Sequence, residues 1–141
     1  MKIKVFTDGA CKQNPGGLAT YGFVVKIYKG KETPVHLEKF GVLGEYGDAE
    51  AAEMGAVKKA LLFLQEKNLH KKNVVLYTDS SYCFYRLIGE NHIKCPLIKK
   101  IRDDNFKLLQ NFKRFRVKWI PREKNRRADR LSKKAYYYYG G

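Results

Sequence analysis

The chain has 141 residues and a formal net charge of +15, because 29 lysines and arginines outnumber 14 aspartates and glutamates. Its length suits one domain and is too short for two cores, and its hydrophobic content of 44% excludes a disordered chain. So basic a surface favours a polyanionic partner; nucleic acid is the first candidate and an anionic membrane surface the alternative. We expect a single domain over residues 1–141, with a short tyrosine-rich tail from about residue 136.

The cysteines and the N-terminus bear on the cellular compartment. Cys11, Cys83 and Cys95 are odd in number and contain no Cys-x-x-Cys pair, which favours reduced thiols and disfavours a zinc site. Lysines interrupt the first residues too early for a signal peptide, and no apolar stretch approaches the length of a membrane span. We therefore expect a cytoplasmic protein without a membrane partner, and we expect it to be a monomer.

The first third of the chain has the alternating pattern of β-strands. Strands are predicted at residues 2–8, 20–29 and about 33–43. A loop rich in turn-forming residues separates the first two strands, and Gly30-Lys31 provides the next turn. Because these connections are short, the three strands should form an antiparallel meander.

The pattern becomes helical from about residue 48 to residue 68. The residues Met54, Val57, Ala60, Leu61 and Leu64 fall on one side of this predicted helix. Glu53 falls in the middle of the same side, where a carboxylate is costly unless it has a partner. A solvated glutamate belongs on the opposite side, so Glu53 is the strongest purely physical indication of a functional group.

The remaining elements alternate between strands and helices. A fourth strand is expected at 73–79, and because a helix leads to it, it should run parallel to another strand. A short helix should begin near Ser80 or Ser81, followed by a helix at 96–112, a fifth strand at 114–120 and a last helix at 125–137. Trp119 is expected to pack in the core or on its strand and not to serve as a platform for base stacking. The order predicts an α/β fold with a five-stranded mixed sheet flanked by helices.

Asp8 and Asp79 each close an apolar run, and each is therefore placed at the C-terminal end of a strand. In open α/β sheets this edge binds ligands. If the two strands are neighbours, the aspartates face each other, and like charges this close raise each other's pKa unless a cation intervenes. With Glu53 they would form an oxygen-only site suited to Mg²⁺ or Mn²⁺, and two such ions could activate water against a phosphodiester.

Asp129 has weaker physical support. On a helical wheel Ala128, Leu131 and Ala135 cluster on one side of the last helix, and Asp129 lies nearly opposite. The wheel therefore predicts an ordinary solvated residue.

Four segments, in order along the chain, resemble the motifs of type 1 ribonuclease H, in its compact archaeal and bacterial form. They are Thr7-Asp8-Gly9-Ala10 with Asn14-Pro15-Gly16, then Glu53-Met54-Gly55-Ala56, then Thr78-Asp79-Ser80, and finally Trp119-Ile120-Pro121 with the segment Asn125 to Ser132. Each motif alone is weak, but four in this order over nearly the whole chain are specific.

The resemblance implies the ribonuclease H-like fold, with the first strand paired to the fourth. It implies two Mg²⁺ ions, with Mn²⁺ as an alternative, held by Asp8, Glu53, Asp79 and Asp129. It implies an endonuclease that cuts the RNA strand of an RNA–DNA hybrid and leaves 5′-phosphate and 3′-hydroxyl ends. The family reads RNA through its 2′-hydroxyls. The residues that the resemblance assigns to substrate binding are Gly9, Cys11, Lys12, Asn14, Pro15, Gly16, Ser80, Arg122, Lys124 and Asn125.

The chain departs from the family pattern at two places. Many members carry Thr-Asn-Asn before the helix glutamate, where this chain has Asp48-Ala49-Glu50. Many also carry a histidine in the loop after the fifth strand, where this chain has Arg122-Glu123-Lys124. Substrate contacts and turnover are therefore expected to differ.

Three other functions compete with this interpretation. A non-catalytic nucleic-acid-binding module on the same fold is the main alternative, and the presence of all four acids argues against it. A phosphatase-like hydrolase would need an Asp-x-Asp nucleophile motif, but Gly9-Ala10 follows Asp8. A domain of a larger reverse transcriptase is disfavoured by the start at Met1 without being excluded.

Overall fold

The computed structural model describes residues 1–12, 17–89 and 92–139. Within them the order of elements is the predicted one, and the bounds differ by a few residues at most. The elements are β1 (Lys2–Cys11), β2 (Leu18–Tyr28), β3 (Val35–Glu45), α1 (Ala49–Glu66), β4 (Asn73–Thr78), α2 (Ser81–Leu87), α3 (Pro96–Leu109), β5 (Arg114–Trp119), the 3₁₀ helix η1 (Arg122–Lys124) and α4 (Arg126–Tyr139).

The five strands form one mixed sheet in the order β3-β2-β1-β4-β5. The first three strands are antiparallel, as predicted, while β4 runs parallel to β1 and β5 runs parallel to β4. The β1–β4 pairing ends at Phe6 and Tyr77. Beyond that point β1 and the segment that follows β4 are no longer paired, and Asp8 and Asp79 lie in the gap between them.

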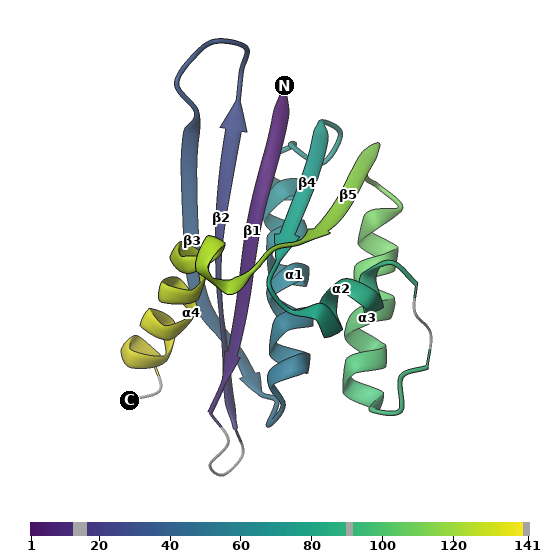
Figure 1. Ribbon diagram of the computed structural model, residues 1–141. Helices are drawn as coiled ribbons and strands as arrows, with labels where there is room; N and C mark the ends of the chain where they lie inside the picture. Colours follow the sequence, from purple (N-terminus) through teal and green to yellow (C-terminus); the bar gives the residue numbers. More distant parts are fainter. Residues whose placement is uncertain (13–16, 90–91, 140–141) are drawn as a thin grey trace.

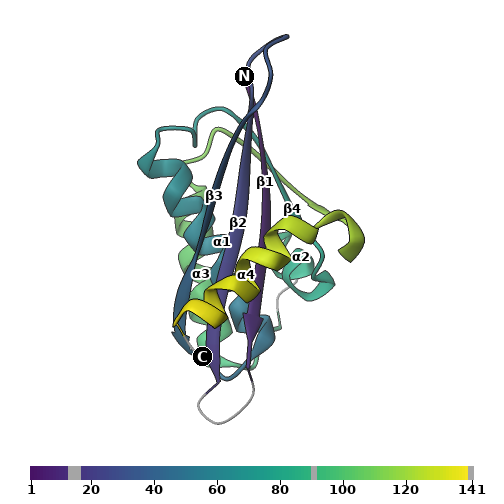
Figure 2. The same ribbon diagram turned by 90° about the vertical axis from the view of Figure 1, so that its left-hand side faces the viewer.

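Helices cover the two faces of the sheet unequally (Figures 1 and 2). α1 and α3 lie on one face, and the main core fills the space between them and the sheet, with Phe23, Met54, Leu61 and Leu76 fully buried. α4 lies on the other face and packs across β1, β2 and β3. The first halves of β1, β4 and β5 have no helix over them on this side (Figure 1).

Gly22 allows α4 to pack this closely on the sheet. A Cβ atom at Gly22 would lie 2.5 Å from Leu131 Cβ and 2.7 Å from the carbonyl oxygen of Ala128, both on α4. Such contacts are far inside van der Waals range. The helix that carries Asp129 and Ser132 is therefore seated by the absence of a side chain on β2.

Gly22→Ala should lower the free energy of unfolding by about 1–3 kcal/mol, because the added methyl group overpacks the α4–sheet contact. Urea denaturation followed by circular dichroism measures this loss. Val42→Ala, at an exposed position of β3, is the control and should change stability much less. Equal losses in the two variants would contradict the close packing of α4 on Gly22.

Three local predictions are corrected. β1 continues to Cys11, so Asp8 is not the end of a strand but lies inside the β1–β2 ladder, opposite Gly22. Trp119 is 51% exposed and does not pack in the core, because it lies at the end of the edge strand β5. The tyrosines from residue 136 form the last turn of α4, which extends to Tyr139 and brings the rings of Tyr138 and Tyr139 against Phe40.

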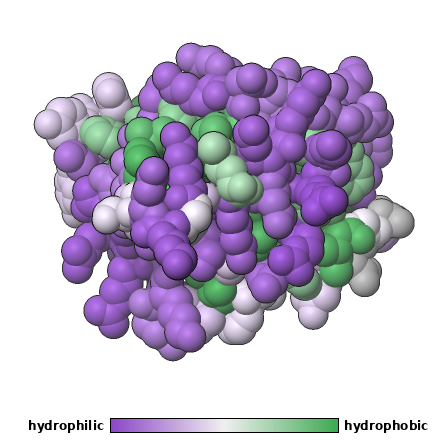
Figure 3. Space-filling view, turned by 90° about the horizontal axis from the view of Figure 1, so that it is seen from above, coloured by the Kyte–Doolittle hydropathy of each residue, from purple (hydrophilic) through white to green (hydrophobic). Residues whose placement is uncertain are grey.

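The surface agrees with the composition. Seen from the end at which β1 begins, it is mostly hydrophilic with small hydrophobic patches (Figure 3). None of the described helices has the length and apolar character needed to cross a bilayer.

Candidate active site

Three carboxylates from distant parts of the chain converge at one edge of the sheet. Asp8 comes from β1, Glu53 from α1, and Asp79 directly follows β4. One oxygen atom from each lies within 4.8 Å of the other two. The convergence that the sequence predicted for these three residues is present in the structure.

Gly9 brings Glu53 into the cluster. A Cβ atom at Gly9 would lie 2.6 Å from the backbone nitrogen of Glu53 and closer still to the carbonyl oxygen of Ala52, so only glycine lets α1 approach β1 this closely. In this arrangement the Gly9 N–H donates a hydrogen bond to Glu53 Oε1. Gly9 was predicted to bind substrate, and the structure gives it the additional role of positioning an acid.

Neighbouring side chains fix the two aspartates. The Ser132 hydroxyl, on α4, donates to Asp8 Oδ2 at 2.5 Å. Asn125 Nδ2 donates to Asp79 Oδ2 at 3.2 Å and to the Thr7 carbonyl oxygen at 2.8 Å. Trp119 Nε1 donates to the backbone oxygen of Asp79 at 3.1 Å. Neither Ser132 nor Trp119 was predicted to act at the acids, although both lie in the fourth motif.

The acids stand in an environment that disfavours their charge. Burial raises the pKa of Asp8 to about 7, the Ser132 hydrogen bond opposes this, and the charges of Asp79 and Asp129 add to it. Burial also raises the pKa of Glu53 well above its usual value, and Asp8 raises it further. The pKa of Asp79 is raised by burial and lowered by its hydrogen bond from Asn125. Repulsion of this kind is relieved by a bound cation.

The donor set fits a hard divalent cation. It consists of carboxylate oxygens, and Asp8 and Glu53 are placed where their mutual repulsion is strong. Arg122 is the cation that lowers the pKa of all three acids, and its side chain belongs to an exposed residue. One exposed arginine offsets only part of three buried or half-buried negative charges.

Asp129 belongs to the same cavity, contrary to the helical-wheel prediction of a fully solvated residue. Its side chain is 20% exposed and forms an ion pair with Lys133 at 3.0 Å. Together with Asp8, Glu53 and Asp79 it lines a cavity of about 510 Å³. A helical wheel shows only which side of α4 is apolar. The first turn of α4, which carries Asp129, lies beside the acid cluster because of how α4 packs against other elements.

The structure divides the predicted substrate-binding residues. Gly9, Ser80 and Arg122 line the acid cavity. Lys124 and Asn125 line a second cavity on the other side of η1. Asn14, Pro15 and Gly16 lie outside the described residues.

Cys11, Lys12 and Asn125 also have contacts within the protein. The Cys11 thiol donates to the Gly17 carbonyl oxygen at 3.3 Å, and the Lys12 ammonium lies 4.9 Å from the centre of the Tyr136 ring. Asn125 is only 2% exposed. Its amide nitrogen donates to Thr7 and Asp79, and its contact with substrate stays a prediction.

The acidic segment that replaces the family's Thr-Asn-Asn has a structural role. Asp48 is the N-cap of α1, and its side chain accepts a hydrogen bond from the Ala51 N–H at 2.9 Å. Glu50 lines the acid cavity, and burial together with the charge of Asp48 raises its pKa. One acid of this segment thus stabilises the helix that carries Glu53, and the other adds negative charge to the cavity.

Ser132→Ala should weaken divalent-cation binding by about 10–100-fold, because Asp8 loses the hydrogen bond that orients it. Isothermal titration calorimetry with Mg²⁺ measures the affinity. Thr33→Ala removes an exposed hydroxyl in the β2–β3 turn and should leave the affinity unchanged. Unchanged binding in the Ser132 variant would show that its hydroxyl does not position a ligand.

A family model and a curated relative match large parts of this chain. The family model described as "Reverse transcriptase-like" matches residues 6–135. The "Ribonuclease H" of Chromobacterium violaceum is 42% identical over 82 residues, which are 57% of this chain and 48% of that protein. The chain therefore spans about half the length of this curated relative.

Solved structures match over nearly the full length. RNase H1 from the halophilic archaeon Halobacterium salinarum NRC-1 has a TM-score of 0.84 at 26% identity, and the match covers 97% of this chain and 98% of that one. LC11-RNase H1 in complex with an RNA/DNA hybrid has a TM-score of 0.79 at 29% identity, covering 94% and 95%. With the family model, the shared fold and the acid cluster in agreement, this chain belongs to the ribonuclease H family.

Proposed function

We propose that the protein is an endonuclease that hydrolyses the RNA strand of RNA–DNA hybrids in the presence of Mg²⁺. The observation that carries the proposal is the convergence of Asp8, Glu53 and Asp79 within 4.8 Å in an otherwise strongly basic chain. The family membership supports the choice of reaction, and the hybrid bound to the related LC11-RNase H1 supports the choice of substrate.

In this proposal Asp8, Glu53, Asp79 and Asp129 hold two divalent ions. Such ions, when bound, would supply a nucleophile at neutral pH and stabilise the charge that develops on the leaving 3′-oxygen. The reaction would leave 5′-phosphate and 3′-hydroxyl ends. Mn²⁺ would serve in place of Mg²⁺, because the ligands are all oxygen atoms.

The chain's own residues then have separable roles. Ser132 and Asn125 orient Asp8 and Asp79, and the Gly9 N–H orients Glu53. Arg122 is exposed beside the acids, where it would contact a phosphate of the substrate. Gly9, Cys11, Lys12, Ser80 and the loop Asn14-Pro15-Gly16 would contact the hybrid in the family's manner, together with Lys124 at the end of η1.

A cleavage assay tests this function. RNA–DNA, RNA–RNA and DNA–DNA duplexes of one sequence, labelled on each strand, are incubated with Mg²⁺ or with EDTA. We expect cleavage of the RNA strand of the hybrid alone, dependent on Mg²⁺. Binding without cleavage would instead support a non-catalytic nucleic-acid-binding module. The affinity for hybrid should also fall steeply with salt, because lysines and arginines displace condensed counterions.

A further inference from the structure

The uncovered half of the sheet is a second charged surface next to the acid cluster. Asp8 accepts a hydrogen bond from Ser132 of α4, so its side chain points to the face of the sheet that α4 partly covers. Because side chains alternate along a strand, the other even-numbered residues of β1 point to the same face. The strand registers extend this assignment to the neighbouring strands. The cations on the part of this face that α4 leaves open, which we call the basic sheet face, are Lys2, Lys4, Lys26, Arg114, Arg116 and Lys118.

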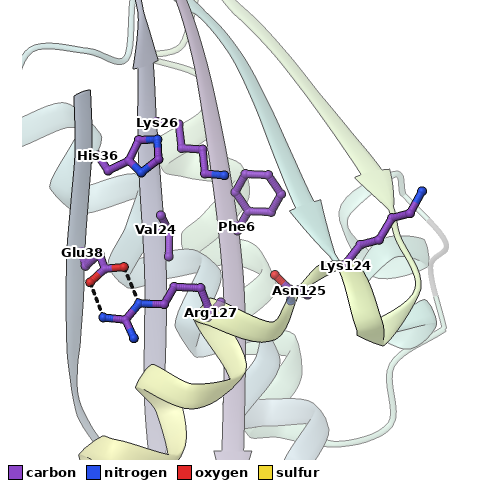
Figure 4. A pocket seen from close by; sticks show the side chains of 9 residues that line it. Phe6, Val24, Lys26, His36, Glu38, Lys124, Asn125 and Arg127 are labelled. Carbon is purple, nitrogen blue, oxygen red and sulfur yellow. Dashed lines mark hydrogen bonds and ion pairs between the residues drawn. The ribbon is translucent and has the colours of Figure 1, made fainter. Parts of the chain in front are cut away.

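Negative charge is almost absent from this surface. In the described strands, Glu38 of β3 is in register with Phe6 of β1, since both pair with Val24 of β2. Arg127 of α4 neutralises it through two hydrogen bonds of 2.5 Å and 2.7 Å, drawn as dashed lines in Figure 4. The cations of β5 have no such partner on the adjacent strand β4: Arg116 lies opposite Val75 and Lys118 opposite Tyr77. The surface therefore complements a polyanion.

An aromatic pair lies at the centre of the basic sheet face. The rings of Phe6 and Tyr77 are stacked, with 4.7 Å between their centroids and 13° between their planes. Both residues are half-buried, and the Lys26 ammonium lies 5.0 Å from the centre of the Phe6 ring. The rings precede Asp8 and Asp79 by two residues each in the chain, so the pair adjoins the acid cluster.

The 3₁₀ helix η1 lies between the two surfaces and contributes a basic lining residue to the cavity on each side. Arg122 lines the acid cavity, whereas Lys124 lines a cavity of about 270 Å³ together with Phe6, Lys26 and His36 (Figure 4). Arg122 and Lys124 therefore place positive charge on both sides of the exposed Glu123 of η1. A nucleic-acid strand that passes from the cluster to the basic sheet face would meet these two cations and this one acid on η1.

We propose that the basic sheet face binds the single-stranded extension of a nucleic acid whose hybrid portion lies at the acid cluster, an inference that rests on the proposed function. A single strand suits this surface better than a duplex, because unpaired bases can stack on aromatic side chains while cations hold the backbone. Residues 114, 116 and 118 place their cations about 6.6 Å apart along β5, in an extended row. The site would favour hybrids that carry overhangs over blunt ones.

Binding of blunt and overhanging hybrids tests the proposal. Fluorescence anisotropy is measured with Ca²⁺ in place of Mg²⁺, on a blunt hybrid and on the same hybrid with a single-stranded extension at either end. We expect an extension at one end to tighten binding at least fivefold in the wild type. The double variant Arg116→Glu/Lys118→Glu should lose this gain and keep its affinity for the blunt hybrid within about twofold.

Lys59→Glu/Lys107→Glu is the matched control, because it changes the net charge equally at exposed positions of α1 and α3, the helices on the opposite face of the sheet. It should keep the gain from the extension. Competition by oligo(dT) but not by polyglutamate of equal charge would identify nucleic acid as the ligand.

Three results would overturn the inference: no gain from an extension in the wild type, an equal loss for blunt and extended hybrids in the β5 variant, or equal competition by polyglutamate. Cleavage of blunt hybrid with Mg²⁺ is scored separately. Failure of the proposed function therefore remains distinguishable from failure of the single-strand site.

Discussion

Asp79→Asn should reduce hybrid cleavage by about 10³-fold while the protein stays folded, because in the proposed function the substitution removes a negative charge that would hold the divalent cations, and little else. The substituted amide keeps an oxygen atom that can accept the hydrogen bond from Asn125, so the local structure is retained. Single-turnover cleavage of a labelled hybrid measures the loss, and circular dichroism verifies folding.

Asp103→Asn is the matched control for this prediction. Asp103 is an acid on the outer side of α3, paired with Lys99 at 3.2 Å, and its side chain is 50% exposed. The same chemical change there should leave cleavage within about twofold of the wild type. Normal Mg²⁺-dependent activity in the Asp79 variant would refute the assignment of the acid cluster as the active site.

Asp8→Asn should stabilise the metal-free protein, and the gain should grow with pH. Burial raises the pKa of Asp8 to about 7 from an unfolded value of 3.8, so the folded state binds more protons than the unfolded state between these values. Stability of the wild type therefore falls as pH rises through this window and levels off above it. The amide that replaces the carboxyl group in the variant carries no charge and avoids this loss.

The expected gain is on the order of 4 kcal/mol above pH 7 and on the order of 2 kcal/mol at pH 5. Urea denaturation in EDTA at pH 5 and pH 8 measures it. Millimolar Mg²⁺ should stabilise the wild type and leave the Asp8 variant nearly unchanged, because a ligand that binds only the folded state adds to stability. A gain that does not change with pH would contradict the raised pKa of Asp8.

The two variants report on different properties of one site. Asp79→Asn measures what the acids do for the reaction, whereas Asp8→Asn measures how far their proximity destabilises the fold in the absence of cations. If neutralising these acids lowers the activity and raises the free energy of unfolding, the acids serve to bind cations and do not stabilise the fold. An acid that stabilised the protein would behave in the opposite way.

The fold followed from local patterns in the sequence. Alternation predicted the strands, the position of Glu53 among apolar residues predicted a buried acid, and the helix before β4 predicted a parallel strand. Asp8 and Asp79 were expected to meet because each follows a buried apolar run. Four motifs in order then pointed to the family, and the comparisons confirmed it.

Contacts between distant segments could not be derived in this way. Asp129 was predicted to be solvated, because a helical wheel records which side of a helix is apolar and not what lies beside its first turn. Asn125 was expected to bind substrate, and the structure shows it buried where its amide nitrogen reaches both Thr7 and Asp79. Trp119 was expected to pack in the core or on its strand; at the end of the edge strand it is 51% exposed, and its indole N–H donates to the Asp79 carbonyl oxygen.

By itself the sequence determined the elements, their order, the family and the three acids that meet, since all of these depend on periodicity and on residue types at strand ends. The tertiary structure alone decided how closely the acids approach, which hydroxyl and amide groups orient them, and which half of the sheet α4 leaves uncovered. These properties depend on the seating of α1 against Gly9 and of α4 against Gly22. Contacts of that kind join residues that lie far apart in the chain, and no local pattern records them.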